Sequence, residues 1–157
     1  MMSNYYEESE AAVDDELIQG QVTAVRVACR RMTSQRLEAV RQSVEQACVL
    51  PAMFGWDRKA AAHAEIFNML ADTVRDPALR QVLNSGVGLM HHLMMTAGPV
   101  AGGVVSSSRR RVLACFLAGD PDGAAGELES ELRFLQFTSR LVNSRAASSN
   151  TEEGAVA

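Results

Sequence analysis

Apolar residues recur at helical spacing through most of this 157-residue chain, and helix start and stop signals interrupt the repeats. Two pairs, Asp76-Pro77 and Asp120-Pro121, each place an acceptor at an N-cap and a proline at the first helical position. No segment alternates apolar and polar residues over the length of a strand. Aromatic residues are only 5% of the chain, which leaves Ala, Leu, Val and Met to build the core. The sequence therefore predicts an all-α fold, an antiparallel bundle of about six helices.

The spacing places these helices at about residues 11–31, 34–49, 58–74, 77–96, 109–118 and 121–144. Thr33 or Ser34, then Asp57, then the serines at 106–108 are the expected caps of the second, third and fifth helices. The Gly-rich stretch 97–108 is expected to be an extended link. Residues 1–10 and 145–157 are polar without periodicity, so we expect disordered ends around one bundle domain, residues 11–144.

Charge excludes some function classes. The net charge is −4, but residues 7–16 hold six acids and no base, and without the acids of both ends the body is mildly basic. That balance is too weak to indicate nucleic-acid binding. No stretch is long and apolar enough for a membrane span. The three cysteines form no CxxC pair, which favours a reducing cytoplasm over a disulfide framework.

The familiar catalytic and metal motifs are incomplete. His63-Ala64-Glu65 has the H-x-E form of zinc deaminases, but the P-C-x-x-C partner is absent. No Glu precedes a histidine by three residues, as di-iron bundles require. The cysteines lie in apolar helical stripes and no G-x-S-x-G elbow occurs. We therefore expect no catalytic residue, no metal and no cofactor.

Two further groups have alternative interpretations. His91 and His92 point about 100° apart on a helix, so one should lie at the surface and the other in a packed or ligand-bearing interior. The Gly-rich link lacks the Gly-Lys-Ser/Thr ending of a phosphate loop. Arg109-Arg110-Arg111 fan around the fifth predicted helix, so either one faces the interior and meets a carboxylate, or all three are solvated.

Several stretches resemble the all-helical effector-binding domain at the C-terminus of FadR-type members of the GntR transcription regulators, the FCD domain. They are HAEIFNMLA at 63–71, DPAL at 76–79, SSRRRVLACFLAGDPDGAA at 107–125, and Glu131-Leu132. The Gly-Asp-Pro-x-x-Ala-Ala element is the most characteristic of them. The resemblance covers about residues 11–142.

The resemblance also implies where a site should lie. Many FCD domains bind a divalent metal with one Asp and three His, and the ion helps to hold a carboxylate effector. The corresponding positions here are Ala64, Asn68, Arg109 and Glu131, so none of the four metal ligands is retained. Arg109 could replace the metal as the anchor of an anionic effector, a carboxylate or an acyl-CoA, or Arg109 and Glu131 could simply pair with each other.

The leading hypothesis is a ligand-sensing, dimerising regulatory domain of a bacterial, cytoplasmic GntR-type regulator. Its predicted ligand-binding residues are Arg109, Asn68, Glu131, Ala64 and His92. DNA contact is expected only through a winged-helix domain that this chain lacks. The alternatives are a stand-alone helical interaction or heterodimerisation module without a small-molecule ligand, and an enzyme. A cavity beside Arg109 would favour the sensor, and a filled contact between Arg109 and Glu131 would favour the interaction module.

Overall fold

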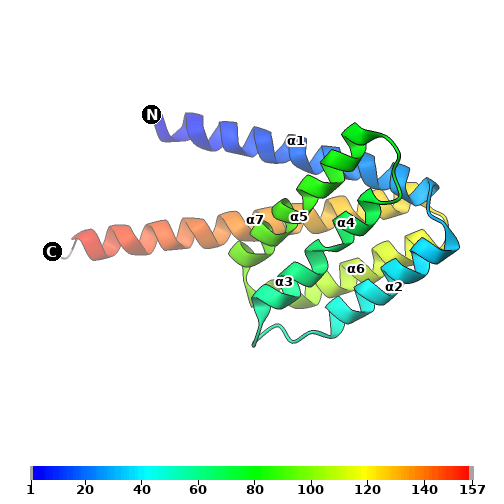
Figure 1. The fold of residues 1–157 in the computed structure, drawn as a ribbon. Coiled ribbons are helices and arrows are strands. Elements are labelled where there is room, and N and C mark those ends of the chain that lie inside the picture. Colours follow the sequence, from blue (N-terminus) through cyan, green and yellow to red (C-terminus); the bar gives the residue numbers. More distant parts are fainter. Residues whose placement is uncertain (1, 156–157) are drawn as a thin grey trace.

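A computed structural model describes the backbone of residues 2–155 and the side chains of residues 14–150. This part of the chain is an all-α bundle without strands (Figure 1). Its α-helices are α1 (Met2–Arg30), α2 (Ser34–Val49), α3 (Trp56–Ala64), α4 (Ile66–Ala71), α5 (Pro77–Ala97), α6 (Gly102–Leu117) and α7 (Pro121–Ala155). A 3-10 turn, η1 (Pro99–Ala101), joins α5 to α6. The predicted fold class is confirmed, and no described helix is long and apolar enough to cross a membrane.

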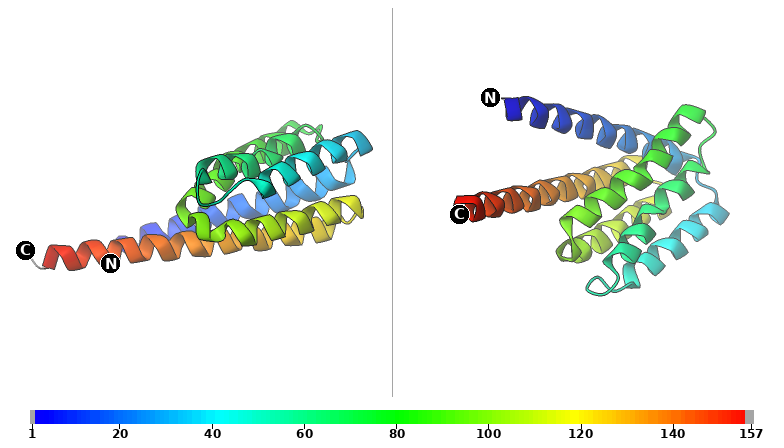
Figure 2. Two further views of the ribbon diagram at one scale, coloured as in Figure 1. Left: turned by 90° about the horizontal axis from the view of Figure 1, so that it is seen from below. Right: turned by 60° about the vertical axis from the view of Figure 1, so that its left-hand side comes forward.

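The first and last helices of the chain lie side by side. Asp15 pairs with Arg133, and the Gln19 amide donates to Glu129 at 2.9 Å, so α1 and α7 run antiparallel. α7 also packs along α6 and α5, and α3 and α4 pack on α5. α2 closes the remaining side against α6 and α3 (Figures 1 and 2).

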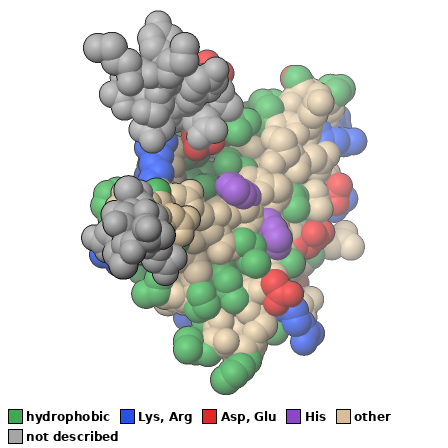
Figure 3. Space-filling view, turned by 90° about the vertical axis from the view of Figure 1, so that its left-hand side faces the viewer, with side chains coloured by type: hydrophobic (Ala, Val, Ile, Leu, Met, Phe, Trp, Pro, Cys, Tyr) green, Lys and Arg blue, Asp and Glu red, His purple; other side chains and the backbone are tan. Residues whose placement is uncertain are grey.

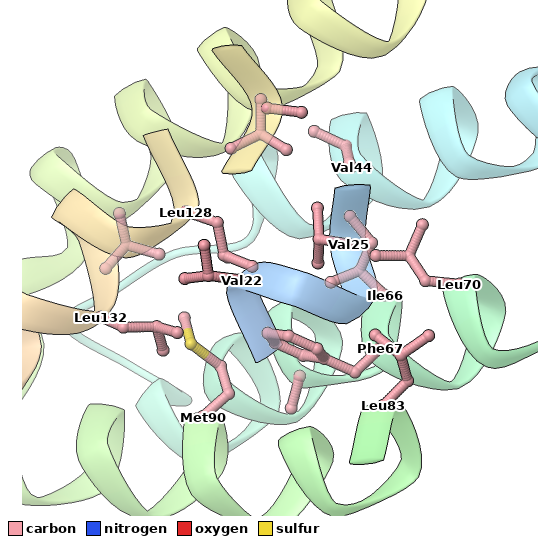
Figure 4. Packing of buried hydrophobic residues seen from close by; sticks show 14 of the residues in the cluster. Val22, Val25, Val44, Ile66, Phe67, Leu70, Leu83, Met90, Leu128 and Leu132 are labelled. Atoms are coloured by element: carbon pink, nitrogen blue, oxygen red, sulfur yellow. The ribbon is translucent and has the colours of Figure 1, made fainter. Parts of the chain in front are cut away.

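Buried side chains of α1 lie at the centre of the core (Figure 4). Val22 lies beside Leu128 of α7, while Val25 points toward Ile66 of α4. Phe67 is the one fully buried aromatic side chain among the described residues, and aliphatic residues and alanines fill most of the remaining space. Small side chains let the helices approach closely, as the low aromatic content predicted.

Two predicted helix starts are confirmed in atomic detail. Asp76 accepts from the backbone N–H of Ala78 at 2.8 Å, and Pro77 occupies the first helical position of α5. Asp120 accepts from the N–H of Gly123 at 2.9 Å at the start of α7. Thr33 accepts from the N–H of Arg36 at the start of α2, so Thr33 and not Ser34 is the cap.

The prediction of a long extended link over 97–108 is wrong. Only Gly98, at a φ of 84°, breaks the chain, and α6 already begins at Gly102, so the serines at 106–108 lie inside the helix and not at its cap. A Cβ on Gly102 would lie 3.1 Å from the Cβ of Ala52 and 3.3 Å from the Trp56 ring. The glycine is therefore used for a close approach between α6 and the start of α3, which no local signal reveals.

The third predicted helix is divided in two. α3 ends at Ala64 and α4 begins at Ile66, with Glu65 between them. Gly55, at a φ of 98°, stands at the start of α3 without a side-chain cap, so Asp57 lies in the first turn and is not the N-cap.

Helix continues through both segments that were expected to be disordered. α1 begins at Met2 and α7 extends to Ala155, and the two ends leave the bundle on the same side (Figures 1 and 2). Residues 1, 156 and 157 lie outside the described residues, as do the side chains of 2–13 and 151–155.

Candidate functional site

A buried ion pair joins α6 to α7. The Arg109 Nη2 donates to Glu131 Oε1 at 2.7 Å, and both side chains are almost completely buried. The Ser108 hydroxyl donates to the other carboxylate oxygen of Glu131 at 3.2 Å. The antiparallel packing of the two helices explains why residues 22 positions apart in sequence meet.

Arg109 has further contacts from neighbouring helices. Its guanidinium carbon lies 5.7 Å from the centre of the Phe67 ring of α4, within the range of a cation–π contact. Its Nη2 also lies 3.6 Å from the Met90 sulfur of α5. The Arg109 Nε has no hydrogen-bond partner. Burial raises the pKa of Glu131, and the neighbouring guanidinium and Ser108 partly oppose that rise.

His63 of α3 lies beside this ion pair and is only 1% exposed. Neither of its ring nitrogens has a hydrogen-bond partner. Burial, together with the positive charges of Arg109 and Lys59, lowers the pKa of His63 to about 3. The imidazole is therefore neutral near pH 7. The H-x-E pattern of the sequence suggested only a zinc ligand at His63, although the spacing of four from Lys59 places both residues on one helix face.

Lys59 is a buried cation of α3, one helical turn before His63. Its ammonium donates to the carbonyl oxygens of Ala47, Cys48 and Leu50 at 2.9–3.0 Å. These carbonyls end α2, so Lys59 satisfies acceptors that the helix leaves unpaired. Burial lowers the pKa of Lys59.

The interior beside Arg109 is filled. A narrow gap lined by Ser43 of α2, His63 of α3 and Arg109 of α6 leaves about 0 Å³ for a water molecule. A small-molecule site typically offers about 300–1,000 Å³. The described structure therefore has no ligand cavity at the position that the family resemblance indicates.

The structure brings only some of the predicted ligand-binding residues together. Arg109 and Glu131 meet in the interior, and Ala64 is buried on α3. Asn68 is half-buried, and its amide donates to the Glu65 carboxylate at 3.2 Å instead of to the ion pair. His92 is exposed on α5 and His91 is half-buried, so the expectation of His92 in the interior is wrong and His63 is the interior histidine.

A metal-binding cluster and a reactive thiol are two further possibilities among the described side chains. Among them, no group of three or more His, Cys, Asp or Glu residues could hold a metal ion. Burial raises the pKa of the Cys29 and Cys115 thiols, and the Asp120 charge adds to this effect, so neither is activated as a thiolate. The buried ion pair neutralises itself and holds two helices together.

A second candidate surface lies on the projecting half of α7. Phe137 is 66% exposed, and Leu141 follows one helical turn later on the same face. Residues 132–151 contain three arginines and no acid, whereas residues 7–16 of α1 contain six acids and no base. Figure 3 shows hydrophobic side chains on the molecular face from which the two helix ends project.

Comparisons of the chain with protein-family models, with curated proteins and with solved structures find no match.

Proposed function

We propose that this chain is a non-catalytic helical interaction module that pairs with a second copy of itself through the outer halves of α1 and α7. The exposed Phe137 and Leu141 on the projecting half of α7 carry this proposal. They lie on the exposed face of α7, whose opposite face packs against three other helices. Large apolar side chains that stand together on a helix face indicate a protein contact more often than a free surface.

Charge complementarity supports a second copy as the partner. The outer half of α7 carries Arg140 and Arg145, which are exposed without an ion-pair partner among residues 14–150, and Glu152 and Glu153 follow them in the sequence. The outer half of α1 is acidic by sequence, and no base among residues 14–150 forms an ion pair with its exposed Glu16. A two-fold axis would bring Arg140 and Arg145 of each copy to the acidic α1 of the other, so both contacts form twice.

The filled interior supports an interaction role over ligand sensing. An effector of the predicted carboxylate class would have to displace Glu131 from Arg109 and open a space that is absent. Breaking a buried ion pair leaves an uncompensated charge and is costly. The resemblance to FCD domains also implies dimerisation. A dimer agrees with this part of the resemblance, but it needs a contact between two chains and no ligand in the interior.

Sedimentation of the whole chain over a range of concentrations tests the proposal. We expect a species of twice the 17.0 kDa chain mass, and weaker dimerisation at high salt because screening reduces the charge attraction. Phe137→Ser should raise the dissociation constant at least about tenfold, as loss of a buried aromatic anchor does. Phe54→Ser is the matched control, because Phe54 is 87% exposed in the link between α2 and α3 and lies on neither α1 nor α7.

Two outcomes would contradict the proposal. A monomer at every concentration would do so, as would an equal effect of the two phenylalanine substitutions. A fatty acid or sugar acid that raises the melting temperature, with the effect lost in Arg109→Met, would instead support the ligand-sensing function.

A further inference from the structure

A cleft of about 380 Å³ lies at the end of the bundle opposite the projecting helix ends. Its lining residues are Arg31, Thr33, Arg36, Asp72, Thr73 and Arg75, and we call it the arginine cleft. Two segments build it: residues 31–36, which form the link from α1 to α2 and the first turn of α2, and the loop between α4 and α5. The arginine cleft shares no residue with the Arg109–Glu131 ion pair or with the exposed pair Phe137 and Leu141 of α7.

The arginine cleft carries an excess of positive charge. Arg36 lies 3.7 Å from the Asp72 carboxylate, a loose pairing between exposed side chains. Arg31 and Arg75 have no carboxylate within ion-pair distance among residues 14–150. Three arginines and one aspartate therefore line the cleft, and two of the three arginines have no ion-pair partner among residues 14–150.

The backbone beneath these side chains is well anchored. The guanidinium of Arg80, on α5, donates twice to the carbonyl oxygen of Val74, at 2.9 and 3.2 Å, and so holds the loop between α4 and α5. The Thr73 hydroxyl donates to the Leu70 carbonyl at 2.7 Å. On the opposite wall, Thr33 accepts from the Arg36 N–H at 3.2 Å. Binding an anion would order side chains but would not have to order these loops.

We propose that the arginine cleft binds a small soluble anion that carries a diphosphate group. Three arginines on the two walls of one cleft suit tetrahedral phosphates, whose oxygens point in several directions, better than a single planar carboxylate. The start of α2 adds the positive end of a helix dipole at the same place. The volume lies within the range of small-molecule sites and accommodates more than one phosphate group. Asp72 pairs only loosely with Arg36, and the anion would take its place.

Isothermal titration of the whole chain with inorganic pyrophosphate, ADP, inorganic phosphate and citrate tests the proposal. We expect pyrophosphate and ADP to bind at least about tenfold more tightly than phosphate or citrate, since each added charge-assisted hydrogen bond strengthens binding by about that factor. Arg31→Gln and Arg75→Gln should each weaken pyrophosphate binding by about tenfold or more for the same reason. Both residues are exposed, so the melting temperature should not change.

Matched controls lie at the opposite end of the bundle. Arg58→Gln removes an equivalent exposed charge near the start of α3 and should leave pyrophosphate binding unchanged. Asp72→Asn should tighten binding because it frees Arg36, whereas Asp57→Asn should not. The absence of pyrophosphate binding would overturn the proposal. Equal losses in Arg58→Gln and Arg31→Gln, or citrate binding as tight as pyrophosphate binding, would overturn it as well, because either would indicate nonspecific charge attraction.

Discussion

A charged side chain inside a helical bundle depends on its partner, because burial removes the water that would otherwise solvate it. Arg109 and Glu131 meet this condition at 2.7 Å, and Ser108 occupies the second carboxylate oxygen. The pair therefore selects one alignment of α6 against α7. Its effect on stability has to be measured with both partners present and with both removed.

We predict that Arg109→Met and Glu131→Leu each lower the free energy of unfolding by about 3–5 kcal/mol, the usual cost of leaving one partner of a buried ion pair without the other. The double variant Arg109→Met/Glu131→Leu should be more stable than either single variant, because no charge remains in the interior. Urea unfolding of the four proteins measures both effects. Simple additivity of the two losses would contradict the coupling that the 2.7 Å contact implies.

His63 gives the fold a pH dependence. Its pKa is about 3 in the folded protein, against an ordinary value near 6.5 in the unfolded chain. Between these values the unfolded chain takes up a proton that the folded protein does not, so stability is full above pH 6.5 and falls as the pH drops toward 3. The decrease from this one residue approaches about 1.4 kcal/mol per pH unit.

His63→Leu should therefore flatten the decrease in unfolding free energy between pH 6.5 and pH 5 relative to the parent protein, because Glu131 is present in both proteins. His92→Gln is the matched control, since His92 is exposed and should leave the slope as it is in the parent protein. Urea unfolding at three pH values in this interval measures the slopes. Parallel slopes for the parent and His63→Leu would show that the imidazole is not neutral in the folded protein.

At the scale of the element, α5 shows how one helix can contain two glycines with opposite roles. Gly86 is buried, and a Cβ there would lie 2.5 Å from the Gln21 Oε1 of α1 and 2.7 Å from a ring carbon of Phe67. Gly88 is exposed, and a Cβ there would meet nothing within 4 Å. The first glycine permits α1, α4 and α5 to approach closely, and the second only loosens the helix.

We predict that Gly86→Ala lowers the unfolding free energy by about 1–3 kcal/mol through overpacking. Gly88→Ala should raise it by roughly 1 kcal/mol, because alanine favours helix over glycine by about that amount. The two variants place the same substitution two residues apart in the same helix, so each controls for the other. Thermal or urea unfolding gives both values, and a change of the same sign in both would contradict the packing around Gly86.

Helix starts could be predicted from sequence because their signals are local. Asp76 and Asp120 accept from backbone N–H groups two or three residues ahead. In the sequence, the proline that follows each aspartate already indicates a helix start. The interruption at Glu65 and the early start of α6 at Gly102 could not be predicted in this way. Gly102 is in a helix because Ala52 and Trp56 pack against it, and that contact belongs to tertiary structure.

At the scale of the whole molecule, the candidate site also divides into residues that a sequence pattern indicated and contacts that depend on tertiary structure and were missed. The family resemblance suggested that Arg109 and Glu131 share the interior, and the structure pairs them. It gave no indication that Asn68 would turn to Glu65 or that His63, not His92, would be the interior histidine. The arginine cleft was also missed, because its residues come from segments about 40 positions apart and each looks like an ordinary surface residue.

The antiparallel contact between α1 and α7 has a consequence for the order of folding. Side chains of α1 such as Val22 and Val25 are fully shielded only when α7 is in place, and α7 leaves the ribosome after every other helix described here. Early in synthesis, α1 therefore exposes an apolar face that its proper neighbour cannot yet cover. The contact between α1 and α7 requires closure of a long loop, so it carries a larger entropic cost than the contacts between helices that are neighbours in sequence.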